Sequence, residues 1–322
     1  MFDLLLIFRT DTLFTHIYLS IIPQFPMKPG STVALVTPFE PTTGQIDFPA
    51  LERLLQFHLN QGTDNLCILG TTGESAVLSM TERAQVLQLA VATVKGRMPI
   101  LCGTGTIDPV QVQALTQQAL DLGCDASLVV TPYYVKPPQR GLVKHFQTAA
   151  EVGLPVILYN VPGRTSVNLS DESIGILAQH ENIVGVKDAT GDLSRLASLK
   201  TQLQAVGVND FLCYSGDDSS TMDYVLQGGD GCISVTANCA PQLMHQMMAA
   251  ALRGDRAEAQ RMNQLLMSLH ADLFCEASPM PVKWALYRMG LVGSSYCRPP
   301  LDVLDPALEG RMEAALRAAN LI

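Results

Sequence analysis

The amino-acid sequence predicts an α/β protein built as a (β/α)8 barrel, a TIM barrel, with a helical appendage at its C-terminal end. Three observations support this prediction. From residue 31 onward, short apolar runs alternate with amphipathic segments at a period of about thirty residues, the size of one βαβ unit. The chain contains eight such runs, and after the last of them it carries only patterns typical of helices. With 48% hydrophobic residues, the chain can also bury a large core.

The eight apolar runs are the predicted strands. They are almost continuously hydrophobic, as strands covered by helices on both faces must be. Right-handed crossovers repeated eight times favour closure of the sheet into a barrel. An open, doubly wound parallel sheet is the alternative that the pattern alone leaves open. The predicted strands are residues 32–36, 66–69, 99–103, 127–130, 155–159, 184–187, 211–214 and 232–235.

The segments between the strands carry signals for the beginning and the end of helices. Ser79 and Glu82 form a capping box, in which each residue satisfies a backbone N–H of the first helical turn. Asp108 and Pro109 supply an N-cap and a first-turn proline, and Gly123 ends the same helix. Two further segments carry core-facing stripes of apolar residues: one follows Asp47, and the other covers residues 193–203.

The chain divides into three segments, two of which form one domain. Residues 1–26 are predicted to be a disordered or non-native leader, because their apolar runs are too short for a signal peptide or a membrane span. Met27, just before the first convincing strand, is the expected physiological start. Residues 27–240 are predicted to form the barrel, and residues 241–322 its last helix and the helical region. No linker of the kind that separates domains interrupts them.

Composition and spacing exclude several classes of function. The net charge of −9 and the pI near 5.1 argue against nucleic-acid binding, because no basic stripe could neutralise phosphates. Eight cysteines occur singly without a C-x-x-C motif, which favours a reducing cytoplasm. The six histidines lack metal-ligand spacing, and no glycine-rich loop has nucleotide-binding spacing. We therefore expect no metal, no cofactor and no membrane contact, with small molecules or other copies of the chain as partners.

Lys187 is the leading candidate for a catalytic residue, because it ends the sixth predicted strand. Reactive groups of such barrels lie at the C-terminal ends of the strands. Apolar walls disfavour the charged form of a lysine, and its free amine can condense with a carbonyl to an iminium, which serves as an electron sink. The alternative for a single lysine is a structural ion pair with a neighbouring carboxylate.

Tyr159 ends the neighbouring predicted strand, and Thr71 and Thr72 follow the second predicted strand; all three could move protons at that imine. The phenol of Tyr159 can donate and accept a proton, as formation and breakdown of a carbinolamine require. The alternative is a tyrosine that bridges core and solvent. The two threonines could extend a proton relay, or they could merely cap the loop that the flanking glycines shape.

Two charged groups complete the predicted strand ends. Arg164 lies in a Pro-Gly turn, where its planar guanidinium suits a substrate carboxylate; a surface salt bridge is the alternative. The pair Asp217–Asp218 precedes a predicted helix, and we interpret it as an N-cap rather than a cation site.

Taken together, the strand ends resemble the dihydrodipicolinate synthase branch of the N-acetylneuraminate lyase superfamily. The resemblance runs from about residue 31 to the C-terminus. Each motif alone is weak, but the ordered set is specific, and Arg164–Thr165 favours the synthase branch over related lyases. The motifs are G-T-T-G-E-S (70–75), T-P-Y-Y (131–134), Y-N-V-P-x-R-T (159–165), G-V-K-D-A-T-G (185–191) and S-G-D-D (215–218).

The resemblance implies a role for each matching residue. Lys187 would form an imine with pyruvate, and Tyr159 would be the acid and base at that carbon. Thr71 would relay protons between Tyr159 and Tyr134, which would reach in from a neighbouring subunit. The pyruvyl group would be held by Thr72 and by the backbones of Gly216 and Ile233.

The resemblance also implies the second substrate, the assembly and the place in metabolism. Arg164 would bind the carboxylate of aspartate semialdehyde, whose aldehyde is attacked by the enamine; its amine then displaces Lys187 by cyclising. The product would be 4-hydroxy-tetrahydrodipicolinate, at the first committed step of lysine and diaminopimelate biosynthesis. Family members are usually homotetramers built from tight dimers, and we expect the same for this chain, in the cytoplasm.

The sequence departs from the family at the positions where lysine-inhibited members bind lysine. Two of the matching positions fit, but Ile107 cannot accept a hydrogen bond, Gln111 replaces a carboxylate, and Arg83 adds a positive charge. We therefore expect weak or absent inhibition by lysine. The six matching positions are Ser75, Met80, Arg83, Ile107, Gln111 and Tyr133.

Two alternative functions remain open on the sequence. A sister pyruvate-dependent lyase acting on a sugar acid or a hydroxy-oxoglutarate would keep Lys187 and Tyr159 but has no evident need of Arg164. A catalytically inactive barrel that senses a small acid is the alternative from a different class, because fold does not fix function.

Overall fold

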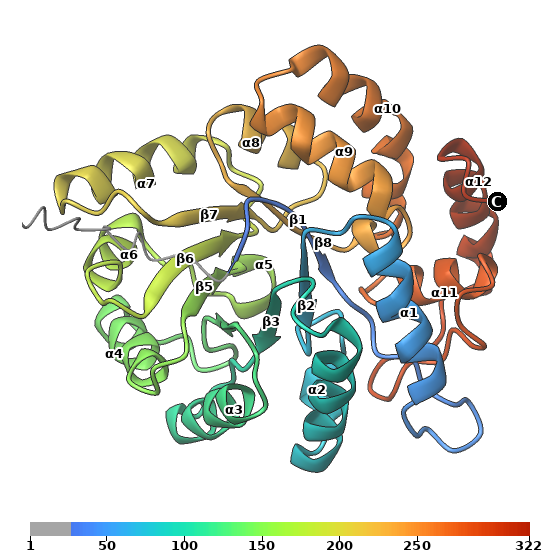
Figure 1. Ribbon diagram of the computed structural model, residues 1–322, viewed down its shortest axis with the longest axis horizontal. Helices are drawn as coiled ribbons and strands as arrows, with labels where there is room; N and C mark the ends of the chain where they lie inside the picture. Colours follow the sequence, from blue (N-terminus) through green and yellow to red (C-terminus); the bar gives the residue numbers. More distant parts are fainter. Residues whose placement is uncertain (1–26) are drawn as a thin grey trace, which may run out of the picture.

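The computed structural model describes residues 27–322. Eight parallel strands follow one another in sequence order and close into a barrel, with β1 paired to β8 (Figure 1). The predicted barrel is therefore confirmed, and the open-sheet alternative is wrong. The predicted leader, residues 1–26, lies outside the described residues.

All eight predicted strands are present, each displaced by at most two residues at either end. The observed strands are β1 Gly30–Ala34, β2 Asn65–Ile68, β3 Ile100–Gly103, β4 Ala126–Val130, β5 Val156–Asn160, β6 Ile183–Asp188, β7 Leu212–Ser215 and β8 Gly231–Ser234.

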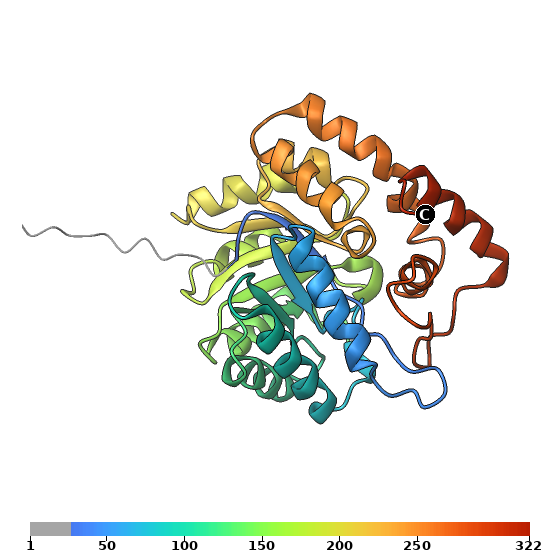
Figure 2. The same ribbon diagram turned by 45° about the vertical axis from the view of Figure 1, so that its right-hand side comes forward.

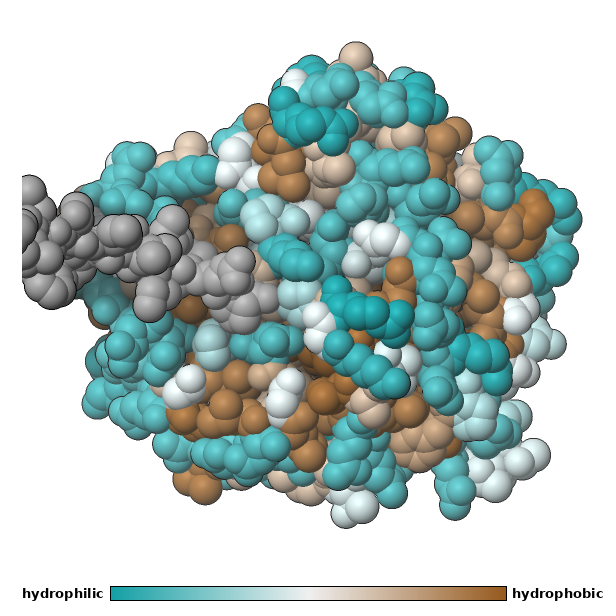
Figure 3. Space-filling model, in the orientation of Figure 1, coloured by the Kyte–Doolittle hydropathy of each residue, from teal (hydrophilic) through white to brown (hydrophobic). Residues whose placement is uncertain are grey.

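The helices surround the barrel, and on the face drawn in Figure 3 most of the rim is hydrophilic while hydrophobic residues gather below the centre. The bounds of the helices are α1 Phe48–Asn60, α2 Met80–Val94, α3 Pro109–Asp121, α4 Gln139–Ala150, α5 Pro162–Thr165, α6 Asp171–Leu177, α7 Ser194–Ala205, α8 Thr221–Leu226, α9 Pro241–Leu252, α10 Arg256–Asp272, α11 Met280–Arg288 and α12 Glu309–Ala318, with single 3-10 turns η1 Ser75–Val77, η2 Thr236–Asn238 and η3 Pro306–Leu308.

The caps predicted for α2 and α3 are confirmed. The side chain of Ser79 accepts a hydrogen bond from the backbone N–H of Glu82, whose carboxylate accepts from the N–H of Ser79. Asp108 accepts from the N–H of Val110 at the start of α3. Gly123 follows α3 with a φ of +84°, the left-handed conformation that commonly ends a helix.

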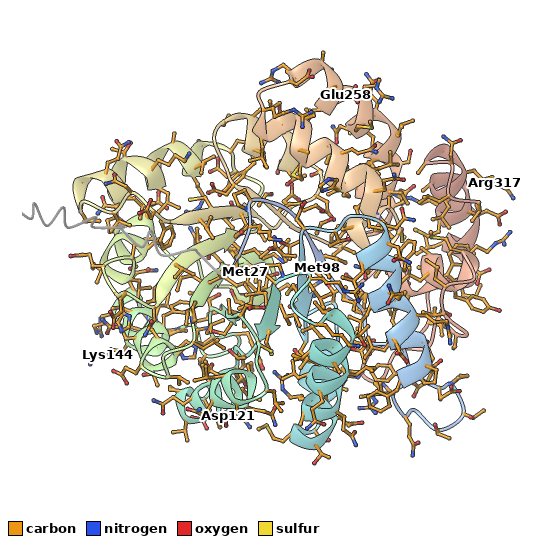
Figure 4. The ribbon with its side chains drawn as sticks, in the orientation of Figure 1. Met27, Met98, Asp121, Lys144, Glu258 and Arg317 are labelled. Carbon is orange, nitrogen blue, oxygen red and sulfur yellow. The ribbon has the colours of Figure 1, made fainter. Side chains whose placement is uncertain are left out.

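The end of the barrel where the strands begin is closed by Met27, whose side chain is buried among residues of the barrel interior (Figure 4). The phenol of Tyr214 donates a hydrogen bond of 2.8 Å to the carbonyl of Lys28 beside it. Apolar side chains fill this end, so the space for a ligand lies at the opposite end, where the strands finish.

The C-terminal region is helical, as predicted. Helix α9 packs on β1 as the last barrel helix, and α10 packs against both α9 and α12. Figures 1 and 2 show α10 above α9, and α11 and α12 on the side of the barrel toward α1. Within residues 27–322, no helix has the length and the apolar character needed to cross a bilayer.

The predicted N-cap role of the Asp217–Asp218 pair is confirmed for Asp217, whose carboxylate accepts from the backbone N–H of Ser220 at 3.0 Å just before α8, and is wrong for Asp218. Helix α8 begins after Ser220, whose side chain makes no capping hydrogen bond. Instead, the carboxylate of Asp218 reaches across to the loop after β8. There one oxygen accepts from the N–H groups of Val235 and Thr236 and from the Thr236 hydroxyl, at 2.9–3.0 Å. Three converging donors on the next strand hold this carboxylate more effectively than a single helix N–H would.

Candidate active site

Two adjoining cavities open at the C-terminal ends of the strands. The smaller, of about 180 Å³, is lined by the ends of several strands and by the loops that follow them. The larger, of about 620 Å³, lies beside it. Thr71, Val161, Arg164 and Ser278 line both cavities. A ligand that fills the smaller space can therefore extend into the larger one.

Lys187 lines the smaller cavity. It pairs with Tyr159 on β5 and with Tyr214 on β7, and its side chain is 6% exposed. Its Nζ lies over the ring of Tyr159, 4.4 Å from the ring centroid. Lysine and phenol on adjacent strands thus meet in one cavity, as the sequence predicts.

The ion-pair alternative for Lys187 is wrong for the part of the chain that the structure describes. No carboxylate there forms a salt bridge with its amine. The adjacent Asp188 is bound elsewhere, because one of its oxygens pairs with Arg195 at 2.8 Å and the other accepts from the N–H of Thr190. The amine of Lys187 is therefore left free to face the cavity.

Gly216 provides the space that the lysine occupies. A β-carbon at position 216 would lie 2.6 Å from Cε of Lys187 and 2.8 Å from Cβ of Ala189. The N–H of Gly216 donates to the carbonyl of Asp188 at 2.7 Å, which fixes the loop after β7 against the end of β6. The N–H of Gly216 is thus already paired within the protein, and the role of its backbone at the pyruvyl group stays a prediction.

Thr71 and Thr72 stand on the loop after β2, and both line the smaller cavity. Thr71 is exposed and Thr72 is buried. The loop packs tightly on its neighbours, because a β-carbon on Gly103 of β3 would collide with the carbonyl oxygen of Leu69. The hydroxyl of Thr37 donates a hydrogen bond of 2.7 Å to the carbonyl of Gly73. These contacts present both threonines at the same wall of the cavity.

Arg164 lies in α5, is exposed and lines both cavities. The salt-bridge alternative for this residue is wrong within residues 27–322, where no carboxylate pairs with its guanidinium. A planar cation at the junction of two cavities suits the carboxylate of a ligand that reaches from one to the other.

Two predicted residues do not line either cavity. Tyr134 is 89% exposed and has a φ of +70°, so its side chain projects from the surface. Ile233 is buried in the barrel interior, and Val235, just beyond β8, lines the smaller cavity in its place. Any role of Ile233 is therefore confined to its backbone.

The sequence did not identify two residues of the C-terminal region that line the smaller cavity, Phe274 and Ser278. They follow α10 and precede α11, in the segment interpreted only as an appendage. No local pattern marks them, because they reach the cavity through the packing of α10 against the barrel. Among the described residues, no cluster of His, Cys, Asp and Glu is suited to a metal ion.

Five of the six positions that correspond to the lysine-effector site line the larger cavity. Arg83 is 5% exposed there, and its guanidinium donates a hydrogen bond of 2.5 Å to the carbonyl of Gly103. Ile107 does not line the cavity. The five positions are Ser75, Met80, Arg83, Gln111 and Tyr133.

Comparison with known proteins finds close relatives over almost the whole described chain. The model of the Dihydrodipicolinate synthetase family matches residues 27–319. The 4-hydroxy-tetrahydrodipicolinate synthase of Methylococcus capsulatus is 47% identical over 297 residues, 92% of this chain and 100% of that protein. The protein of the same name from Pseudomonas aeruginosa is 48% identical over 297 residues, with the same coverage.

Solved structures agree with these relatives. The crystal structure of the chloride-inhibited dihydrodipicolinate synthase from Acinetobacter baumannii, complexed with pyruvate, superposes with a TM-score of 0.88 at 44% identity; the match covers 91% of this chain and 99% of that one. The synthase from Aquifex aeolicus gives a TM-score of 0.86 at 38% identity, over 91% and 98% of the two chains.

Proposed function

Because this chain belongs to the dihydrodipicolinate synthetase family, we propose that it is a Schiff-base lyase, a 4-hydroxy-tetrahydrodipicolinate synthase, which condenses pyruvate with L-aspartate 4-semialdehyde. The observation that carries the mechanism is the amine of Lys187, which forms no ion pair within the described residues and lies 4.4 Å from the ring centroid of Tyr159 in a small cavity. The reaction belongs to lysine and diaminopimelate biosynthesis.

The first half-reaction forms the imine. The amine of Lys187 adds to the keto carbon of pyruvate, and the carbinolamine loses water as Tyr159 passes a proton to the departing hydroxyl. Thr72 and the backbone at Gly216 and Ile233 hold the pyruvyl group. Loss of a methyl proton then gives the enamine, with Thr71 in the relay that carries protons to and from Tyr159.

The second half-reaction makes the ring. Arg164 binds the carboxylate of aspartate semialdehyde, and the enamine carbon attacks its aldehyde. The amino group of the same molecule then attacks the imine carbon, and the amine of Lys187 leaves as the ring closes. Lys187 itself supplies the electron sink, so we propose that no metal or cofactor takes part.

Borohydride trapping tests this function. In the presence of pyruvate, reduction should attach the pyruvyl group covalently to the tryptic peptide that contains Lys187, and the Lys187→Ala variant should remain unmodified. Rates with aspartate semialdehyde are then compared with rates on sugar acids and on hydroxy-oxoglutarate. Faster turnover of a sugar acid would favour the sister lyase, and absence of any adduct would favour the small-acid sensor.

We also propose that the active enzyme is a homotetramer of tight dimers in the cytoplasm. Tyr134 is 89% exposed and has a left-handed backbone, and this supports a contact with a second copy, because non-glycine residues in that conformation cluster at functional sites. All eight cysteines are free thiols, in keeping with a reducing compartment. Mixing Tyr134→Phe and Lys187→Ala subunits tests the sharing, because mixed dimers regain one intact site.

A further inference from the structure

A buried ion pair connects the loop that carries Thr71 and Thr72 to the C-terminal region. Nζ of Lys283 on α11 lies 2.6 Å from a carboxylate oxygen of Glu74, and both side chains are only 1% exposed. The two residues are 209 positions apart in the sequence. The pair therefore joins the second strand-end loop to a helix that is not part of the eightfold barrel repeat.

The C-terminal region supplies partners for both oxygens of the Glu74 carboxylate. The second oxygen accepts a hydrogen bond of 2.9 Å from the backbone N–H of Arg298. The guanidinium of Arg298 donates to the carbonyl of Val77, further along the same loop, at 2.9 Å. Lys283 and Arg298 also both stack on the ring of Phe39, at 4.2 and 4.5 Å from its centroid. These contacts of the C-terminal region add to those that Thr37 and Gly103 make with the same loop.

The loop itself is strained and needs such support. Leu69 at its start and Glu74 at its end both have left-handed backbones, with φ of +58° and +53°, although neither is glycine. Non-glycine residues keep this conformation only where the surrounding structure determines it. The N–H of Glu74 donates to the carbonyl of Thr71 at 3.0 Å, so the position of Glu74 is transmitted directly to the threonine.

A buried ion pair is poorly suited to stabilising a fold, because desolvation of two charges can exceed their attraction, and apolar replacements are often as stable. Its geometry is specific, however, since a carboxylate with two fixed donors cannot shift without losing one of them. The segment before α11 also brings Phe274 and Ser278 to the wall of the smaller cavity. The same region of the chain thus anchors the loop and supplies part of the cavity.

We propose that Glu74 and Lys283 are positioning residues of the reaction, which hold the strained loop so that Thr71 and Thr72 face the imine on Lys187. The C-terminal region is then part of the active-site architecture rather than an appendage. This inference rests on the proposed function, because it assigns a role within that reaction. Neither residue touches substrate in it; both act through the two threonines.

The test uses Lys283→Met and Glu74→Gln in the full-length protein. Circular dichroism first establishes that each variant is folded at the assay temperature, and borohydride trapping counts the sites at which Lys187 still reacts with pyruvate. We expect kcat/KM for pyruvate, per trapped site, to fall on the order of 10²-fold, the cost of a small misplacement of catalytic groups. The Michaelis constant for the aldehyde, which depends on Arg164, should change little.

Arg311→Met is the matched control. It breaks an ion pair of 2.6 Å with Asp272 between α12 and α10, in the same C-terminal region but away from the loop. Its rates should equal those of the parent. The Thr71→Val background supplies a second readout: if Lys283 acts through this threonine, Lys283→Met should cost much less there than in the parent.

The outcomes separate the inference from the proposed function. If the parent protein forms no adduct with pyruvate, the function fails whatever Lys283 does. If Lys283→Met or Glu74→Gln is folded, forms the adduct and keeps the parental kcat/KM, the inference is overturned while the proposed function stands. The same conclusion follows if the losses of kcat/KM caused by Lys283→Met and Thr71→Val multiply in full in the double variant. If neither single variant folds, the pair serves stability and the inference is likewise overturned.

Discussion

Gly216 and the side chain of Lys187 occupy adjoining space so closely that a β-carbon at position 216 would lie 2.6 Å from Cε of the lysine. The contact is shorter than any that real β-carbons make. The long, flexible side chain of the lysine would have to move, and with it the amine on which the proposed chemistry depends.

The Gly216→Ala variant should therefore be folded but slow. We expect kcat/KM for pyruvate to fall by roughly 10- to 100-fold, because a displaced amine meets the keto carbon at a poorer angle. The rate of borohydride trapping measures this step alone. Gly310→Ala is the control, since nothing lies within 4 Å of its β-carbon. Trapping of Gly216→Ala at the parental rate would contradict the prediction.

Tyr159→Phe should leave the cavity intact and remove its proton donor and acceptor. The ring that lies 4.4 Å from Nζ of Lys187 is retained, so binding of pyruvate should change little. The rate should fall on the order of 10²–10⁴-fold, the range for a positioned general acid and base. Single-turnover trapping checks the prediction. A loss confined to the Michaelis constant would exclude this role for the phenol.

Arg164→Ala should act mainly on the second substrate. Arg164 lies where the two cavities join and makes no salt bridge within the described residues, so its removal breaks no internal ion pair. We expect a higher Michaelis constant for aspartate semialdehyde, with trapping of pyruvate unaffected. Steady-state kinetics with each substrate varied in turn measure both values. An unchanged constant for the aldehyde removes Arg164 from its site.

The barrel and most of its site could be predicted from the sequence, because both are local properties. Each strand is a short apolar run, and a residue that ends such a run, as Lys187 does, reaches the mouth of the barrel. The remaining features depend on contacts between distant segments. The role of Asp218 was misinterpreted because the N–H groups that its carboxylate binds lie in the loop after β8. The pairing of Glu74 with Lys283 spans 209 positions, so no local sequence pattern predicts it.

Inhibition by L-lysine should be weak or absent. The larger cavity holds Arg83, a buried cation whose neighbours are backbone carbonyls, and Gln111, which has no charge to offset the amine of a lysine. A second cation placed there would be repelled at low local dielectric constant. Initial rates at increasing lysine concentration measure the effect. A sub-millimolar inhibition constant would show that the cavity accepts lysine after all.

Stability should fall as the pH drops from 7 to 5, and His58 should account for part of the loss. Burial lowers the pKa of His58 to about 3, so the folded protein keeps this imidazole neutral while the unfolded chain, with a pKa near 6.5, takes up a proton. The stabilisation is therefore complete above pH 6.5 and declines as the pH falls toward 3. At pH 5 the loss from this group amounts to about 2 kcal/mol.

The His58→Gln variant separates this contribution from that of the carboxylates. The amide of the new side chain cannot be protonated and can still reach Thr63, whose hydroxyl lies 2.9 Å from Nδ1 of His58. Urea unfolding measures the free energy of unfolding at pH 7 and at pH 5. Between these two values it should fall by about 2 kcal/mol less in His58→Gln than in the parent. His145, whose pKa burial lowers to about 4, supplies a similar drop in both proteins and so cancels in the comparison. Equal drops in the two proteins would mean that His58 is protonated in the fold, with water or an acceptor at its Nε2.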